Sequence, residues 1–132
     1  MAEARPRRRV LLVDDDEMDR FIVGLALASA GYDVSEVDSA DGAIRHCVTN
    51  LPDALVVDYL MPGMDGLELC RKLRANPAWQ SLPIVVLTGL EDQGLADRAR
   101  AAGADDLVPK STDQQPLLVQ LDWAIRAHSS LP

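Results

Sequence analysis

Short apolar runs alternate with helical patterns along almost the whole sequence, and this alternation restricts the fold more than any other feature. Runs of four to six residues are typical of strands; they are VLLV (10–13), YDVSEV (32–37), ALVV (54–57), IVVLT (84–88) and DLVP (106–109). Five strands alternating with five helices predict right-handed crossovers and a mostly parallel sheet with helices on both faces.

The helices are predicted from apolar spacing and from capping residues. The clearest pattern has i, i+3, i+4, i+7 spacing and Gly31 as its C-cap; it consists of Met18, Phe21, Ile22, Leu25, Ala26 and Ser29. A second helix is predicted to begin after the N-cap Ser39 and to end near Asn50 and Pro52. The helical spacing of the third consists of Leu67, Cys70, Leu73 and Arg74, and that of the fourth of Leu95, Ala99 and Ala102, before Gly103. The fifth has Pro116 in its first turn, followed by Leu117, Leu121, Ala124, Ile125 and His128.

The apolar runs differ in a way that orders the strands. ALVV and IVVL are continuously apolar and suit the centre of a sheet, whereas DVSEV alternates and the last run contains Pro109, so these two belong at the edges. The predicted fold is therefore α/β, a flavodoxin-like doubly wound sheet of order 2-1-3-4-5. At 132 residues we expect one domain over 9–128, a basic tail over 1–8 and a short C-terminal tail over 129–132.

Charge and hydropathy exclude several classes of protein. A net charge of −8 disfavours nucleic-acid binding. The run of Arg5, Arg7, Arg8 and Arg9 could contact phosphate or begin a targeting signal, but the VLLV that follows is too short for a signal-peptide core, so we interpret it as a solvated tail. FIVGLALASAG is far shorter than the ~20 residues of a membrane span. We therefore expect a cytoplasmic protein without membrane contact.

The cysteines and histidines do not form a recognisable site. Cys47 and Cys70 lie in helical segments without a CxxC, and we interpret them as reduced packing residues. His46 and His128 have no obvious partners and are interpreted as surface or boundary residues.

Charged residues stand where the strands end. Asp14, Asp15 and Asp16 follow the first strand, Asp58 the third, Thr88 the fourth and Lys110 the fifth. Because the carboxyl ends of parallel strands meet at one edge, these side chains are expected to converge there. An aspartate after a strand is also a common N-cap, and this is the role expected for Asp16.

Asp14, Asp15 and Asp58 would repel one another by roughly 4 kcal/mol per pair at ~4 Å and an effective dielectric of 20. A hard divalent cation and Lys110 would offset this charge, and carboxylate oxygens favour Mg²⁺. We therefore predict Asp58 as a nucleophile toward a phosphoryl group, with Mg²⁺ and Lys110 neutralising the group and Thr88 donating a hydrogen bond to it.

At these residues the sequence resembles the receiver domain of two-component response regulators. LLVDDD resembles the family's acidic pair, VVDYLMPGMDG its phosphoacceptor loop, IVVLTG the strand that ends in the switch threonine, and AGADDLVPK the segment with the lysine. The resemblance implies that Asp58 accepts a phosphoryl group from a phosphohistidine of a histidine kinase or phosphotransfer protein. It also implies that the backbone carbonyl of Tyr59 completes the Mg²⁺ site, and that Thr88 moves toward the phosphate and repositions the fourth helix.

The sequence departs from the family pattern in three places. Ser111 replaces the usual proline after Lys110, and since a cis bond there would cost roughly 2.5–4 kcal/mol, we predict a trans bond. Leu107 replaces the switch aromatic of the fifth strand. Leu60 and Leu90 are apolar, which predicts restricted water access and slow loss of the phosphoryl group.

The output is less constrained, and the downstream target is unknown. Val119 and Trp123 lie off the apolar stripe of the fifth helix, which predicts a docking patch or a homodimer through the helix 4, strand 5 and helix 5 face, unless Trp123 packs against the sheet. A non-phosphorylated interaction module of the same fold is the main alternative. A haloacid-dehalogenase-type phosphatase would need an aspartate where Leu60 stands, and DDDEMDRF lacks the glycine and glutamate of an EF-hand.

Overall fold

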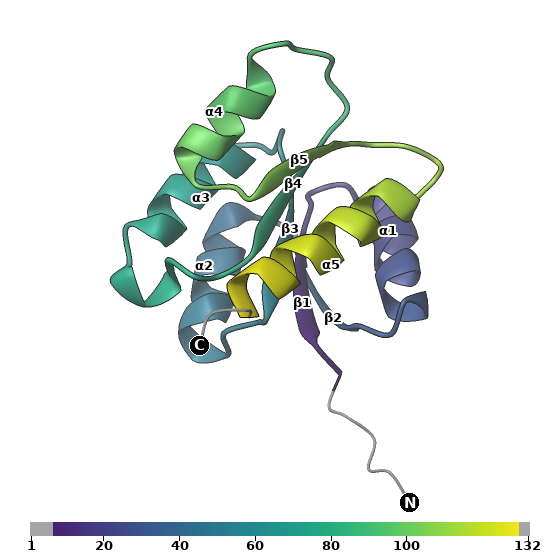
Figure 1. Cartoon of the computed structure of the whole chain (residues 1–132), viewed down its shortest axis with the longest axis horizontal. Coiled ribbons are helices and arrows are strands. Elements are labelled where there is room, and N and C mark those ends of the chain that lie inside the picture. The colour runs from purple at the N-terminus through teal and green to yellow at the C-terminus, as the bar shows by residue number, and fades with distance from the viewer. Residues whose placement is uncertain (1–6, 130–132) are drawn as a thin grey trace, which may run out of the picture.

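The computed structural model describes residues 7–129 and has the predicted architecture (Figure 1). The sheet is parallel, with order β2-β1-β3-β4-β5. Its strands are β1 (Arg9–Val13), β2 (Asp33–Val37), β3 (Ala54–Asp58), β4 (Ile84–Thr88) and β5 (Asp106–Pro109). The helices are α1 (Glu17–Ser29), α2 (Ala40–Thr49), α3 (Gly66–Arg74), the short 3-10 helix η1 (Pro77–Trp79), α4 (Leu95–Ala102) and α5 (Gln115–Ser129).

The predicted tails fall largely outside the described residues. Residues 1–6 and 130–132 are not described, Arg7 and Arg8 are exposed, and α5 continues to Ser129, one residue past the predicted end of the domain. Within residues 7–129 no helix is long and apolar enough to cross a membrane.

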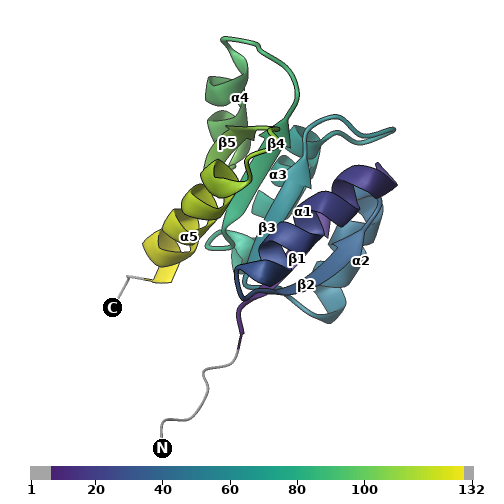
Figure 2. The same cartoon turned by 90° about the vertical axis from the view of Figure 1, so that its right-hand side faces the viewer.

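Two apolar cores lie on the two faces of the sheet. Helices α1 and α5 cover one face and α2, α3 and α4 the other; Figure 2 looks from the side of α1 and α5, which lie in front of the strands. Neighbouring strand residues point to opposite faces, so Leu11 and Leu12 belong to different cores. All five residues of β3 and of β4 are buried, which explains why their sequences are continuously apolar.

Capping residues set the ends of several helices as the sequence predicted. Asp16 accepts from Asp19 N at 2.8 Å and Ser39 accepts from Gly42 N at 3.0 Å, which satisfies amides that have no partner within the helix. Gly103 is the C-cap of α4, whereas the C-cap of α1 is Ala30 and the predicted Gly31 follows it; the two glycines have φ of 106° and 100°, a region that favours glycine.

The predicted helix α1 forms, but most of the apolar pattern that predicted it lies on the side of the helix away from the sheet. Val23, Gly24 and Leu27 face the sheet, whereas the four large apolar residues of the predicted stripe are exposed; they are Met18, Phe21, Ile22 and Leu25. The sequence is apolar on both sides of this helix, so periodicity alone could not choose the inner face.

The amino-terminal edge of the sheet is held together by Asp105. One carboxylate oxygen accepts from Ile84 N at 2.7 Å and lies 3.4 Å from the Arg74 guanidinium, and the other lies 2.7 Å from His128 Nε2. Arg74 also donates to Gly103 O at 2.9 Å. His128 therefore has a partner, contrary to the sequence prediction. The partner lies 23 residues away, which no local pattern reveals.

The prediction for the two cysteines is confirmed, and one of the two alternatives for Trp123 is excluded. Cys47 and Cys70 are buried free thiols, and burial raises the pKa of Cys47 to about 11. On α5, Val119 is exposed and Trp123 is 71% exposed, so Trp123 does not pack against the sheet.

Candidate functional site

The predicted polar residues meet at the carboxyl edge of the sheet. Asp14 follows β1, Asp58 and Thr88 are the last residues of β3 and β4, and Lys110 follows β5. Asp14, Asp58 and Thr88 are the buried polar residues of the described chain. The Lys110 ammonium lies 3.0 Å from Asp58 Oδ1, which confirms that the fifth strand delivers it to this edge.

Asp14, Asp15 and Asp58 form a cluster that could hold a metal ion. One carboxylate oxygen from each lies within 4.8 Å of the others, and Asp15 is the exposed member. Asp14 Oδ1 accepts from Asp16 N at 2.9 Å. Asp14 Oδ2 is buried without a hydrogen bond and lies 3.9 Å from Lys110 Nζ. A buried carboxylate oxygen without a partner is costly, so the donor set fits a small hard cation such as Mg²⁺.

The site shifts the pKa values of its charged groups in a consistent way. Burial, followed by repulsion from Asp58, outweighs the hydrogen bond from Asp16 N and raises the pKa of Asp14 to about 6. Burial also raises the pKa of Asp58, although Lys110 opposes this. Burial lowers the pKa of Lys110, but its hydrogen bonds to Asp19 and Asp58 together hold that pKa above its ordinary value.

Asp19 is the site residue that sequence reasoning missed. Its Oδ2 lies 2.9 Å from Lys110 Nζ, as close as the Asp58 oxygen. The two residues are 91 positions apart, but Asp19 lies one turn after the N-cap Asp16, where it faces the same edge of the sheet. A search of the first turn of α1 for charged residues would have included it.

The segment after Lys110 has the predicted backbone. No cis peptide bond occurs among residues 7–129, so the bond between Lys110 and Ser111 is trans. Lys110 N donates to Thr88 O at 2.7 Å, which fixes the lysine at the end of the sheet.

The loop after Asp58 is closed by backbone hydrogen bonds. Tyr59 N donates to Leu87 O, and Gly66 N donates to Tyr59 O, each at 2.8 Å. A Cβ on Gly66 would lie 2.5 Å from Asp58 O, so this position requires glycine. The Tyr59 carbonyl already accepts one hydrogen bond, which leaves a single lone pair for a metal.

Thr88 and Tyr59 connect the site to the β4–α4 segment. The Thr88 hydroxyl accepts from Leu90 N at 3.0 Å. Arg98 of α4 pairs with Asp92 at 3.0 Å, and the Tyr59 side chain adds to the effect of Asp92 in raising the pKa of Arg98. Leu60 and Leu90, the two apolar residues that flank the site, are both exposed.

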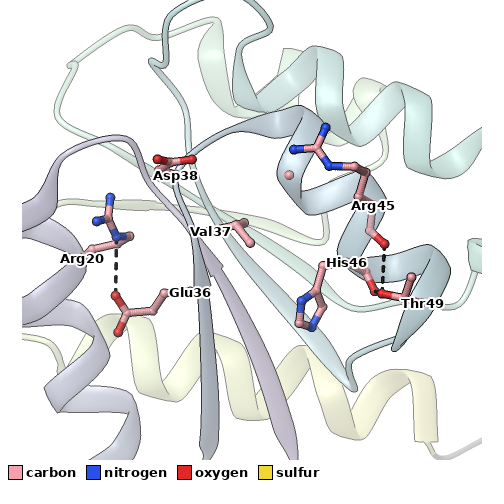
Figure 3. Close-up of a pocket in the computed structure, with 8 residues that line it drawn as sticks. Arg20, Glu36, Val37, Asp38, Arg45, His46 and Thr49 are labelled. Carbon is pink, nitrogen blue, oxygen red and sulfur yellow. Dashed lines mark hydrogen bonds and ion pairs between the residues drawn. The ribbon is translucent and has the colours of Figure 1, made fainter.

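Two hollows lie near the site. The larger, about 610 Å³, runs along the edge strand β2, with Arg20 and Glu36 on one side and Arg45 and His46 on the other (Figure 3). It touches the site indirectly, because Arg20 donates to Asp14 O at 2.8 Å. The smaller, about 430 Å³, borders the site itself; it is lined by Asp19, Ile22, Val23, Leu87, Lys110, Ser111, Thr112 and Gln114.

Comparison with known families decides what this arrangement is. The sequence profile described as "Response regulator receiver domain" matches residues 10–122, which is most of the chain. The chain is a response regulator receiver domain. Receiver domains belong to two-component signalling, and the acidic cluster of Asp14, Asp15 and Asp58 is the acidic pocket of this phosphoaccepting class. The domain is therefore a signalling module rather than a conventional enzyme.

Individual relatives agree with this assignment. The receiver domain is 37% identical over 121 residues to the response regulator MprA of Mycobacterium sp. (strain KMS), covering 92% of this chain and 52% of that protein. It is 32% identical over 118 residues to the phosphate regulon transcriptional regulatory protein PhoB of Rhizobium meliloti, covering 89% and 52%. The chain thus spans about half the length of these relatives.

A solved structure agrees as well. A putative response regulator from Chloroflexus aurantiacus superposes with a TM-score of 0.87 at 35% identity, covering 91% of this chain and 98% of that one.

Proposed function

We propose that the receiver domain takes a phosphoryl group onto Asp58 from a phosphohistidine of a histidine kinase or phosphotransfer protein, in a Mg²⁺-dependent step in the cytoplasm. The observation that carries the proposal is the buried Oδ2 of Asp14, which accepts no hydrogen bond, beside the Lys110–Asp58 contact. A surface used only for protein contact would have no reason to bury a carboxylate oxygen without a hydrogen bond.

The residues divide the chemistry between them. A carboxylate oxygen of Asp58 forms a bond to phosphorus while the phosphorus–nitrogen bond of the phosphohistidine breaks and the imidazole takes up a proton. Lys110 stabilises negative charge on the phosphoryl oxygens, and the Thr88 hydroxyl donates a hydrogen bond to one of them.

Asp14, Asp15 and Asp58, with the Tyr59 carbonyl as a fourth donor, would hold Mg²⁺. The bound ion would neutralise the charge that accumulates on the transferring group.

The experiment uses a small acyl phosphate as donor. Wild type and Asp58→Asn are incubated with the donor and Mg²⁺, and their masses are measured by intact-protein mass spectrometry. A single phosphoryl adduct on wild type alone is expected, and it should disappear when Mg²⁺ is chelated. An adduct on both proteins would place the phosphoryl group elsewhere, and no adduct with any donor would favour the non-phosphorylated interaction module.

The exposed stripe of α1 supports a protein as the natural donor. Met18, Phe21, Ile22 and Leu25 form an apolar surface that begins directly after the acidic cluster, and Ile22 also lines the smaller hollow beside Lys110. Ile22→Asp should slow transfer from a phosphohistidine protein at least tenfold while leaving labelling by the acyl phosphate unchanged. Equal rates from the protein donor would rule out this docking surface.

Output is proposed to pass through α4 and α5. When the Thr88 hydroxyl turns toward the phosphoryl group, its bond from Leu90 N is lost, which releases the start of the β4–α4 segment. Leu107 stands in place of the switch aromatic residue, so no aromatic ring at this position can rotate in response to phosphorylation.

The exposed Val119 and Trp123 mark the α4–β5–α5 face as the surface for a homodimer or a downstream protein. Trp123→Ser should abolish phosphorylation-dependent dimerisation, as measured by sedimentation in an analytical ultracentrifuge. A dimer that persists in this variant would place the interface on another face.

Loss of the phosphoryl group is proposed to be slow. The apolar side chains of Leu60 and Leu90 flank the site and offer no polar atom to orient an attacking water. Replacing both with serine should shorten the lifetime of the adduct, and rapid self-dephosphorylation of the wild type would contradict the proposal.

A further inference from the structure

The Lys110 ammonium lies between two carboxylates from different parts of the fold. It is 3.0 Å from Asp58 Oδ1 and 2.9 Å from Asp19 Oδ2, so neither partner is favoured by distance. Asp58 comes from β3 and is buried, whereas Asp19 comes from α1 and its side chain is 41% exposed. One positive charge is therefore divided between the proposed phosphorylation site and a residue outside it.

The electrostatics of Lys110 point the same way. Partial burial disfavours its charged form, but the hydrogen bonds from its side chain to Asp19 and Asp58 more than compensate for this. Asp19 is thus a principal partner of the lysine, although it is no member of the acidic cluster that could hold a metal.

We propose that Asp19 is a positioning residue that shares Lys110 with Asp58 and thereby sets how strongly Lys110 holds a phosphoryl group. The phosphoryl part of this statement rests on the function proposed above. In the unmodified protein Asp19 keeps the ammonium at the edge of the sheet. Once Asp58 carries a phosphoryl group, Asp19 competes with the phosphoryl oxygens for the same three N–H donors.

The charge of Asp19 has opposite effects on the affinity of the site for cations and for phosphoryl groups. The negative charge of Asp19 favours a divalent cation in the acidic cluster but offsets the attraction of Lys110 for phosphoryl oxygens. Removing that charge should therefore weaken Mg²⁺ binding and strengthen phosphoryl binding, each by about fivefold for a unit charge at this range in a partly solvated site. A loss of structure would weaken both.

The first experiment needs neither metal nor phosphate. Lys110 is one of two lysines in the chain, and the exposed Lys72 serves as an internal reference for side-chain ¹⁵N resonances. Asp19→Asn should shift the Nζ resonance of Lys110 and leave that of Lys72 in place. Glu17→Gln removes the same charge from the same exposed first turn of α1 and is the matched control, which should shift neither.

The second experiment measures binding in the same variants. Mg²⁺ is titrated first, and beryllium fluoride, a noncovalent mimic of the phosphoryl group, is then titrated at saturating Mg²⁺. Asp19→Asn is expected to bind Mg²⁺ about fivefold more weakly and beryllium fluoride about fivefold more tightly, with both differences shrinking as salt is added. Asp19→Ala tests the same signs should the asparagine variant fold poorly.

The outcomes separate this inference from the proposed function. An unmoved Lys110 resonance, weaker binding of both ligands, or equal effects of Glu17→Gln would overturn the role of Asp19. If beryllium fluoride binds to no variant, the proposed function fails, while the lysine resonance and the Mg²⁺ titration still decide whether Asp19 shares Lys110.

Discussion

Replacing Asp14 with asparagine should stabilise the metal-free domain although it destroys part of the proposed site. Burial raises the pKa of Asp14 to about 6, against 3.8 for an ordinary aspartate. At 1.36 kcal/mol per pH unit, this corresponds to about 3 kcal/mol of lost folding stability once the side chain is fully ionised. The asparagine side chain would keep an oxygen to accept from Asp16 N and would carry no charge.

The sign follows from proton linkage. The folded state binds the Asp14 proton more tightly than the unfolded state, so the contribution of Asp14 is most favourable below about pH 3.8 and is lost as the pH rises through about 6. Asp14→Asn should therefore gain about 2 to 3 kcal/mol at pH 7.5 and almost nothing at pH 4. For a domain of this size the gain at pH 7.5 is a rise in Tm of roughly 10 °C.

Urea denaturation followed by circular dichroism, in chelator, measures the difference directly. Asp15→Asn is the matched control: it removes the same charge from an exposed member of the cluster and should change the unfolding free energy by less than about 0.5 kcal/mol. Saturating Mg²⁺ should stabilise wild type but not Asp14→Asn. Equal stability of wild type and Asp14→Asn at pH 7.5, or a gain that persists at pH 4, would refute the reasoning.

Four further variants test the packing that positions the site. In urea denaturation, Leu27→Ala should lower the unfolding free energy by about 3 kcal/mol and Leu25→Ala by less than about 0.5 kcal/mol, because Leu27 is buried and Leu25 is exposed. The reverse order would mean that Leu25, rather than Leu27, faces the sheet. Asp105→Ala should lower the unfolding free energy by about 2 to 3 kcal/mol in the same assay, because Arg74 and Ile84 N lose their acceptor. An unchanged unfolding free energy would show that Asp105 has no structural role. Gly66→Ala should abolish the mass adduct and lower Tm, because its Cβ would collide with Asp58 O, whereas normal labelling would show that the loop can adjust.

Much of the fold could be predicted from the sequence because the relevant signals are local. β3 and β4 are buried on both faces, so their sequences are apolar without interruption, and Pro109 places β5 at an edge. The site followed from topology, since parallel strands end at one edge and thereby bring Asp58 and Lys110 together.

The errors arose where pairing depends on tertiary geometry. In α1 both sides are apolar, and the inner side is defined by the packing of Val23 and Leu27 in the core shared with α5, which is a contact between distant segments. The partner of Lys110 on α1 and the partner of His128 were missed for the same reason. A charged side chain reveals its chemistry in the sequence but not which of several distant charges it will meet.

The network around Asp105 makes the two ends of the sheet mechanically unequal. At its amino-terminal edge, one carboxylate fastens α3, β4 and α5 with contacts of 2.7 to 3.4 Å. At the opposite edge, Lys110 contacts both Asp19 and Asp58, and one oxygen of Asp14 accepts no hydrogen bond. A charge added at the acidic edge would act far from this anchor, so displacement should begin in the β4–α4 segment and be smallest near the ends of α3, β4 and α5 that Asp105 holds.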